Sequence, residues 1–166
     1  PVIILTKSAL AQRDLDLLTG KRAVDFGVTI TTLDESLSKL FEPKSSSPSE
    51  RLALLAEAKK KGIKTYVFLG PLVPHLSDTE ESVRSLLNAV KEVGADYFYV
   101  DRLNPRYGVW PSVRGLLRER FPHLTEEYKK ILFNRAVREK YSLTLAKTVS
   151  KLARQLGFAE KMSLLF

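Results

Sequence analysis

The sequence predicts an α/β fold with a parallel sheet. Four short runs rich in Val, Ile, Phe and Tyr alternate with helical patterns, and this alternation is typical of βαβ units. Three of the four runs are almost continuously apolar, as strands buried on both faces are. The runs are Val2–Thr6, Val24–Thr31, Lys64–Gly70 and Asp96–Asp101. The helices between them therefore either cover both faces of the sheet or ring its outside.

Length and composition predict a single folded domain. The chain has 166 residues, and its 44% hydrophobic and 28% charged residues are enough for a core without the composition of a disordered protein. No apolar run approaches the ~18 residues of a membrane span, and the N-terminus lacks a secretory pattern. We therefore expect a cytoplasmic protein with no membrane partner. The chain begins at Pro1 and enters a strand at once, which indicates a piece of a longer protein.

Two of the connecting helices carry clear start signals. Ser47 precedes Pro48 and is followed three residues later by Glu50, which is the pattern of an N-cap, a proline at the first helical position and a capping box. The triple serine therefore belongs to a helix start rather than to a linker. The segment 77–81 repeats the signal with a capping side chain and acidic residues in the first turn.

The pattern changes after Asp101. Residues 102–124 contain three prolines and predict a loop, a short helix and a further turn. From Thr125 to Gly157 apolar residues follow a 3.6-residue period, which predicts a long helix with one interruption. We expect a first region at 1–104 that holds the sheet and a second at 105–166 that forms a basic C-terminal helical extension.

The charge of the chain favours partners that carry phosphate. Lys and Arg number 27 against 19 Asp and Glu, which gives a net charge of +8. Residues 125–161 hold nine Lys and Arg against four Glu, so most of the excess lies in the helical extension. Such an excess favours nucleic acid through counterion release, although a solvated helix face has the same composition.

Polar residues follow most of the predicted strands. In a parallel α/β fold, ligands bind at the carboxyl edge of the strands, where the following loops meet. The first, second and fourth strands end in polar residues and the third does not. The polar positions are Lys7, Ser8, Thr29, Thr31, Thr32, Asp34, Asp101, Arg102, Asn104 and Arg106.

Lys7 is the most informative of these residues because it directly follows a buried run. Its ammonium is a solvated surface charge, a clamp for a ligand carboxylate or phosphate, or an amine that forms a Schiff base. Thr29 and Thr31 lie two apart and point to the same side of their strand. On the inner side they offer hydroxyls to a polar ligand, and on the outer side they only favour the strand.

Other chemistry is excluded or weakly indicated. The chain has no cysteine, so it holds no disulfide, no thiolate zinc site and no iron–sulfur cluster on its own. No catalytic triad, Walker loop or dinucleotide fingerprint is present. His75 is expected in a surface turn, and Trp110 is expected to be a packing residue.

The ordered segments resemble a known family. TKSALAQRDLDLL (6–18), and the stretch from VTITTLDESLSKLFEPK to GPLVPHLSD (28–78), look like the second half of a radical S-adenosylmethionine (SAM) barrel. The most similar branch is that of the DNA repair photolyases related to spore photoproduct lyase. The likeness is strong over 2–101 and looser through the C-terminal helices, which are similar to the tail of archaeal members.

The resemblance implies a fold and cofactors. Members of this family build a partial TIM-type (β/α) barrel, of which this chain is expected to supply about four β/α units. They bind a 4Fe-4S cluster through three cysteines, and the cluster cleaves SAM to a radical that abstracts hydrogen from the substrate. The cysteine loop is not in this chain, so the resemblance implies a C-terminal half that is inactive alone. Its expected partner is the missing N-terminal half of the barrel, and the charge adds nucleic acid on the basic helices. Because half a barrel leaves an uncovered strand edge, we expect a second copy of the fragment or its own C-terminal helices to cover that surface.

The resemblance also implies roles for individual residues. Lys7 matches a lysine that holds the carboxylate or ribose end of SAM. Thr29 and Thr31 match hydroxyl positions that face SAM, and Leu69, Gly70 and Pro71 match the strand whose backbone lies against the adenine. The chain departs from the pattern at His75, where many relatives have a turn glycine. The alternatives are a cluster-free α/β module that binds nucleic acid or a partner protein, and a Schiff-base lyase that uses Lys7.

Overall fold

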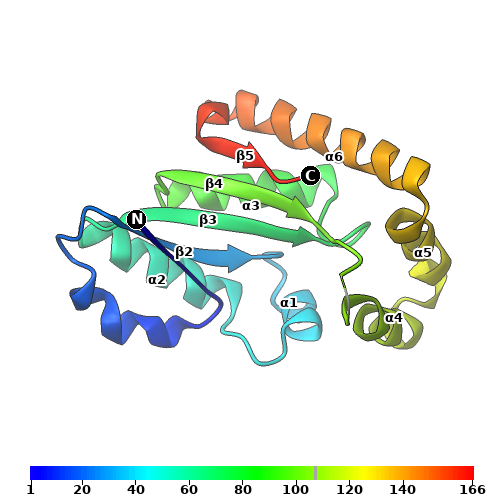
Figure 1. Cartoon of the computed structure of the whole chain (residues 1–166), viewed down its shortest axis with the longest axis horizontal. Helices are drawn as coiled ribbons and strands as arrows, with labels where there is room; N and C mark the ends of the chain where they lie inside the picture. Colours follow the sequence, from blue (N-terminus) through cyan, green and yellow to red (C-terminus); the bar gives the residue numbers. More distant parts are fainter. Residues whose placement is uncertain (107) are drawn as a thin grey trace.

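A five-stranded parallel sheet organises the computed structural model, which describes residues 1–106 and 108–166. The strand order follows the chain, β1-β2-β3-β4-β5, and every neighbouring pair is parallel (Figure 1). The strands are β1 (Val2–Thr6), β2 (Val24–Ile30), β3 (Lys64–Leu72), β4 (Tyr97–Arg102) and β5 (Met162–Leu164). The α/β class, the parallel sheet and the partial TIM-type form expected from the sequence are confirmed.

The helices connect the strands and fill the C-terminal part. They are η1 (Ala9–Leu17), α1 (Glu35–Phe41), α2 (Pro48–Lys60), α3 (Glu80–Glu92), α4 (Val109–Arg120), η2 (Pro122–Leu124), α5 (Thr125–Phe133), α6 (Arg135–Gln155) and η3 (Ala159–Lys161), where η marks a 3-10 helix. Within the part of the chain that the structure describes, no helix combines the length and apolar character needed to cross a membrane.

The predicted helix starts are present. The Ser47 side chain accepts from Glu50 N and the Glu50 carboxylate accepts from Ser47 N, so α2 begins with a complete capping box. Thr79 caps α3 by accepting from Ser82 N. The triple serine is thus part of a helix start, as the sequence predicted.

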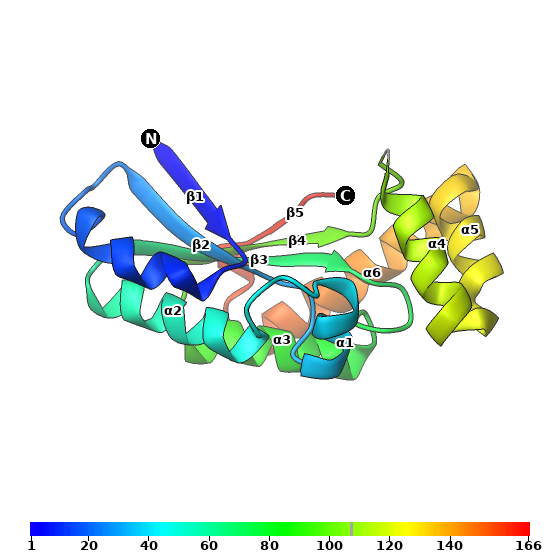
Figure 2. The same cartoon turned by 90° about the horizontal axis from the view of Figure 1, so that it is seen from below.

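The two faces of the sheet differ. Strand alternation directs Val28 and Val67 toward the helices, where they join one buried core with α2 and α3. The opposite, concave face carries aromatic rings of Tyr66 and Tyr97, which stack at a centroid distance of 5.2 Å. Figure 2 shows α1, α2 and α3 below the sheet and the edge strands β1 and β5 rising on the open side. The sheet is therefore covered on one face, as in the wall of a barrel.

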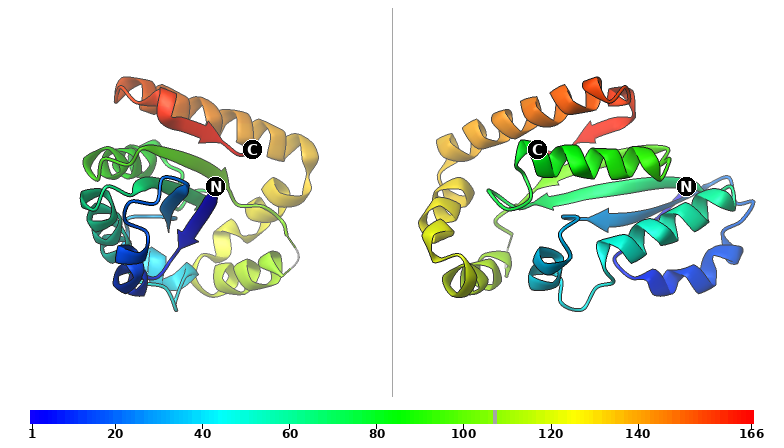
Figure 3. Two further views of the ribbon diagram at one scale, coloured as in Figure 1. Left: turned by 60° about the vertical axis from the view of Figure 1, so that its left-hand side comes forward. Right: turned by 180° about the vertical axis from the view of Figure 1, so that it is seen from behind.

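The C-terminal part packs in two places. Helix α6 lies beside α3 on the outer side of the sheet (Figure 3), and its buried residues Leu145, Val149 and Leu152 join the main core. Helices α4 and α5 form a second small core around Leu117 and Tyr128, beyond the carboxyl ends of the strands. The C-terminal helices therefore leave the concave face open.

The predicted long helix is interrupted once, as expected, because Asn134 ends α5 and caps α6. The sequence reading did not foresee β5, which pairs with β4 after α6. A strand of three residues is too short to show alternation against its surroundings. A domain boundary near residue 104 stays a prediction.

Candidate functional site

A buried carboxylate, Glu42, lies at the carboxyl edge of the sheet between two cations. Its Oε1 lies 2.7 Å from Lys7 Nζ, and its Oε2 lies 2.5 Å from Arg51 Nη2. Glu42 ends α1 as its C-cap residue, Lys7 directly follows β1, and Arg51 belongs to the first turns of α2. The Glu42 side chain is 7% exposed and that of Lys7 is 43% exposed, so Lys7 is the member of the cluster that solvent or a ligand reaches.

Arg51 is fully buried and fixes the local backbone. Its Nε donates to Ser46 O at 2.8 Å and its Nη1 donates to Thr29 O at 2.8 Å. Ser46 in turn connects to the first strand, since its N donates to Lys7 O at 3.0 Å. The guanidinium thus joins the end of β2, the serine loop and the start of α2 in one network, which holds Glu42 beneath Lys7.

Electrostatics keep Glu42 ionised. Burial by itself opposes the charged form, but hydrogen bonds and charges from Lys7 and Arg51 outweigh it, and the pKa of Glu42 lies below its ordinary value. Two cations against one anion leave one positive charge, and only Lys7 presents it at the surface. The cluster is therefore suited to a negatively charged group.

Glu42 predicts a pH dependence of stability. A carboxyl with a depressed folded pKa contributes stability that is fully present above its unfolded pKa of about 4.5 and is lost as the pH falls through the folded value. We expect the difference in free energy of unfolding between the wild type and Glu42→Gln to be constant above that pH and to shrink below it. Urea unfolding of both proteins from about pH 7 to about pH 3 measures this. A difference that stays constant to the lowest pH would contradict the prediction.

Thr31 connects the cluster to the third strand. Its hydroxyl lies 3.0 Å from Glu42 Oε1 and 3.2 Å from Gly70 O, and because both are acceptors it has one proton to share between them. Three of the six residues expected to bind cofactor are thus linked: Glu42 joins Lys7 to Thr31, and the Thr31 hydroxyl reaches Gly70. The expected convergence of strand ends is present for these three.

The other three expected residues lie differently. Thr29 is on the concave face beside Gly27, but its carbonyl is occupied by Arg51. The Leu69 side chain points into the main core, so only its backbone lies near the edge. Pro71 belongs to a separate pocket of about 230 Å³, and Lys7 does not line it. The lining residues are Phe68, Pro71, Asp101, Arg102, Leu103, Asn104, Arg106 and Val109.

The pocket at Pro71 collects the polar end of β4. Asp101 accepts hydrogen bonds from Arg102 N at 2.9 Å and from Asn104 Nδ2 at 3.2 Å. These are residues that the sequence placed at the same edge. The carboxyl edge therefore has two polar sites. The Lys7–Glu42–Arg51 cluster lies beside β1 and β2, and the Asp101 pocket lies beside β3 and β4.

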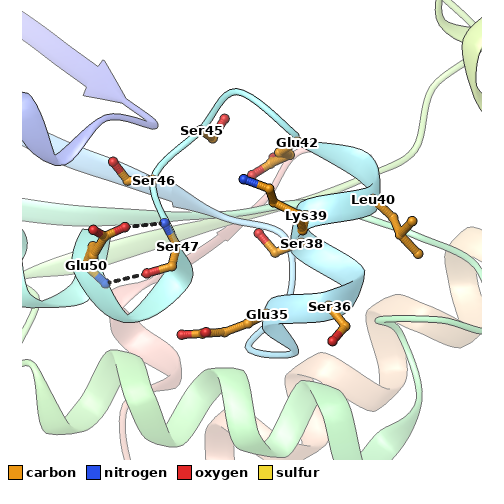
Figure 4. Close-up of a pocket in the computed structure, with 10 residues that line it drawn as sticks. All are labelled: Glu35, Ser36, Ser38, Lys39, Leu40, Glu42, Ser45, Ser46, Ser47 and Glu50. Carbon is orange, nitrogen blue, oxygen red and sulfur yellow. Dashed lines mark hydrogen bonds between the residues drawn. The ribbon is translucent and has the colours of Figure 1, made fainter.

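A larger hollow of about 550 Å³ lies on the other side of Glu42 (Figure 4). Its walls come from α1, the serine loop and the start of α2, with Lys39 and Glu35 among them. Figure 4 shows the capping hydrogen bonds between Ser47 and Glu50 at its margin. The serines that line it are partly engaged in these local contacts, so we assign it no chemistry.

Sequence reasoning did not identify Glu42 and Arg51 as site residues. They are nine positions apart and belong to two helices, so no helical or strand period relates them. The usable signal was an Arg in the buried first turns of α2 near an acidic residue that ends the preceding helix. A buried Arg requires a partner, and Glu42 is the nearby carboxylate that supplies it.

His75 and Trp110 lie where the sequence predicted, in a surface turn and in a packing contact respectively. His75 lies in a turn with a positive φ of 63°, a conformation that glycine adopts without steric cost. Its imidazole Nε2 lies 3.0 Å from Glu127 Oε1 on the surface. Trp110 packs edge-on against Phe133 at a centroid distance of 5.6 Å.

Metal ligands are not grouped in this chain. Over residues 1–106 and 108–166, no three His, Asp or Glu side chains are placed to hold a metal ion, and the sequence has no cysteine. An iron–sulfur cluster therefore does not fit the residues present here.

Known proteins include several similar sequences. No protein-family model matches the chain. The uncharacterized protein MJ0683 of Methanocaldococcus jannaschii is 30% identical over 148 residues, which are 89% of this chain and 53% of that protein. The uncharacterized protein ORF301 of Acidianus two-tailed virus is 31% identical over 71% of this chain and 40% of its own length. The chain thus spans about half, or less, of the curated relatives it matches.

Solved structures share the fold. A variant of spore photoproduct lyase with bound AdoMet (S-adenosylmethionine) and dinucleoside spore photoproduct superposes with a TM-score of 0.65 at 18% identity, over 99% of this chain and 50% of that one. Streptococcus suis SuiB gives a TM-score of 0.52 at 17% identity, over 75% of this chain and 30% of that one. This chain therefore has the fold of about half of the spore photoproduct lyase chain.

Proposed function

We propose that this chain is part of a radical SAM enzyme similar to spore photoproduct lyase, and that its Lys7 cluster forms part of the SAM site. The observation that carries the proposal is the Lys7 ammonium, which stands half-exposed at the carboxyl edge and is fixed from below by Glu42 and Arg51. The fold match to a protein solved with bound AdoMet supports it.

The charge and fixation of Lys7 suit the carboxylate end of SAM. A cation that is already oriented loses less side-chain entropy when it binds an anion. Glu42 holds the ammonium from the protein side, and its own charge is balanced by the buried Arg51, so Lys7 remains available to a second carboxylate. The Thr31 hydroxyl and Gly70 carbonyl lie in the same network, on the side where the adenine of SAM would rest against Gly70 and Pro71.

The cluster ligands would come from a segment outside these residues. When bound, SAM and a 4Fe-4S cluster supply hydrogen-atom abstraction; this chain would bind and orient the SAM end. Strand β1 supports such a partner, because it is an edge strand whose Val2, Ile3 and Leu5 side chains are exposed. A neighbouring β/α unit would pair with that edge and cover those side chains.

The geometry favours the clamp over the Schiff-base alternative. Schiff-base lysines are desolvated in apolar pockets or lie beside another cation. Lys7 is instead half-exposed and its near neighbour is a carboxylate.

Substitution of Lys7 tests the proposal in the full-length protein that contains this chain. We expect Lys7→Ala to weaken SAM binding about 10-fold or more, since a hydrogen bond to a charged group contributes about 1.5–3 kcal/mol. Equilibrium dialysis with labelled SAM measures the affinity. Lys64→Ala is the matched control, because Lys64 also pairs with a carboxylate, Asp25 at 3.0 Å, but at the amino edge of the same sheet.

Two results would count against the proposal. If both variants bind SAM as the wild type does, Lys7 is not the clamp. If the wild type itself binds no SAM, the alternative of a cluster-free module gains support. That alternative has an observation of its own, a pocket of about 120 Å³ between α4 and α5 in which an aromatic ring and three cations outnumber one acid, as in a nucleic-acid contact. Its lining residues are Trp110, Arg114, Arg118, Thr125, Glu126 and Lys129.

A further inference from the structure

Two arginines face a pocket at the β4–β5 end of the structure, away from the Lys7 cluster. The pocket measures about 410 Å³ and lies between the end of β4, helix α6 and the C-terminal segment. Arg102 ends β4 and Arg138 lies in the first turn of α6. The remaining walls are mostly apolar and come from Leu143, Ala146 and Phe166.

Neither guanidinium group forms an ion pair within the part of the chain that the structure describes. Among the described residues, no carboxylate lies within 4.0 Å of either one. The Arg102 side chain donates only to the carbonyl of Leu103 at 3.2 Å, and its Nε is buried without an acceptor in that same part of the chain. Arg138 donates to Leu132 O at 2.9 Å. Both retain donors that a ligand could use.

The two charges also repel one another. Burial lowers the pKa of Arg102 from its ordinary value and the charge of Arg138 lowers it further, while the charge of Asp101 offsets only part of the shift. Glu139 is the acidic residue of the pocket wall, but its carboxylate is 2.7 Å from Arg135 Nε, on the exposed side of α6. An anion between the two arginines would relieve the repulsion and supply the missing acceptor.

We propose that this pocket binds a small organic anion with an apolar body, held by Arg102 and Arg138. The anionic head is a phosphate or a carboxylate, since both accept paired hydrogen bonds from a guanidinium fork. The apolar body lies against Leu143, Ala146 and Phe166, and the Ser142 side chain adds a polar group to the wall. The volume falls within the range of small-molecule sites.

The pocket is independent of the Lys7 cluster but adjoins the sheet edge. Its lining does not include Lys7, Glu42 or Arg51, so the inference does not depend on the proposed SAM site. Arg102 also lines the Asp101 pocket at the carboxyl edge. A bound anion would therefore fix a side chain that forms part of the wall of that second pocket.

Titration with small probes tests the inference in the full chain. Phenyl phosphate and benzoate test the two head groups, inorganic phosphate lacks the apolar body, and benzyl alcohol lacks the charge. We expect phenyl phosphate or benzoate to bind in isothermal calorimetry, with inorganic phosphate about 10-fold weaker and benzyl alcohol undetectable. Binding by either of the first two supports the site and identifies its head group. No binding by either, up to the solubility limit, overturns it.

Variants locate the binding. Arg138→Ala should weaken it about 10-fold or more, as expected for loss of a charge-assisted hydrogen bond. Arg154→Ala, an exposed arginine near the other end of α6, is the matched control and should leave it unchanged. Glu139→Gln removes the acidic residue of the wall from an exposed position and should strengthen binding about 3-fold. If Arg138→Ala fails to fold, Glu139→Gln decides, and binding that neither variant alters would overturn the assignment.

Discussion

Replacing Glu42 by Gln is expected to lower the free energy of unfolding by about 3 kcal/mol, which is near the lower end for removing one partner of a buried ion pair. The loss arises because Arg51, which is fully buried, keeps its charge and loses the carboxylate that balances it. The lower end applies because Lys7, the second partner, is half-exposed and recovers hydration. Urea unfolding at neutral pH measures the change.

A surface acid supplies the control for Glu42. Glu57→Gln removes a carboxylate that lies 2.7 Å from Lys60 Nζ on the exposed face of α2. Exposed pairs contribute little, so its unfolding midpoint should stay close to that of the wild type. Equal effects of the two substitutions would mean that the Glu42 cluster is not a buried network.

Replacing Gly27 by Ala is expected to destabilise the fold by about 3 kcal/mol, the upper end for overpacking a core. A Cβ at this position would lie 2.5 Å from Cε1 of the Tyr66 ring on the neighbouring strand. The ring has nowhere to move, because it stacks on Tyr97 and its hydroxyl donates to Ile4 O at 3.2 Å. Thermal or urea unfolding reports the loss.

Substitution of a second glycine, Gly115, is expected to raise stability rather than lower it. Gly115 lies inside α4, and a Cβ at this position would meet no atom within 4 Å apart from the backbone of its own helix. Gly115→Ala should therefore stabilise the chain by about 1 kcal/mol through helix propensity.

In a double-mutant cycle, Gly27→Ala should cost much less stability when Tyr66 is also replaced by Ala. A cost that does not depend on Tyr66 would show that the contact is not its cause.

The sequence was sufficient for the main sheet because buried parallel strands have an unusual composition. The first four runs became β1 to β4 with ends shifted by no more than two residues. Strand β5 was missed because its three residues follow a helix and pair with β4, which lies about 60 residues earlier in the chain. Such distant pairing leaves no local pattern.

The candidate site was predicted in part. Strand ends are local features, so Lys7, Thr31 and Gly70 were identified and do come together. The ion pair that connects them was not predicted from the sequence, because it depends on how the loop from α1 to α2 folds back beneath β1. Glu42 and Arg51 are brought together by that loop rather than by any period. Leu69 was assigned through the resemblance for its backbone, and its side chain in the core leaves that assignment a prediction.

The strand order has a consequence for synthesis on the ribosome. Strands β2, β3 and β4 each lie next to the strand made just before them, so each of these β/α units finds its docking surface already present. Strand β5 is different, because about 60 residues separate it from β4. The backbone groups of β4 that will pair with β5 stay unpaired until those residues have been made. During that interval β4, rather than the three-residue β5, is the second edge of the sheet, and the nascent protein then most needs shielding from its neighbours.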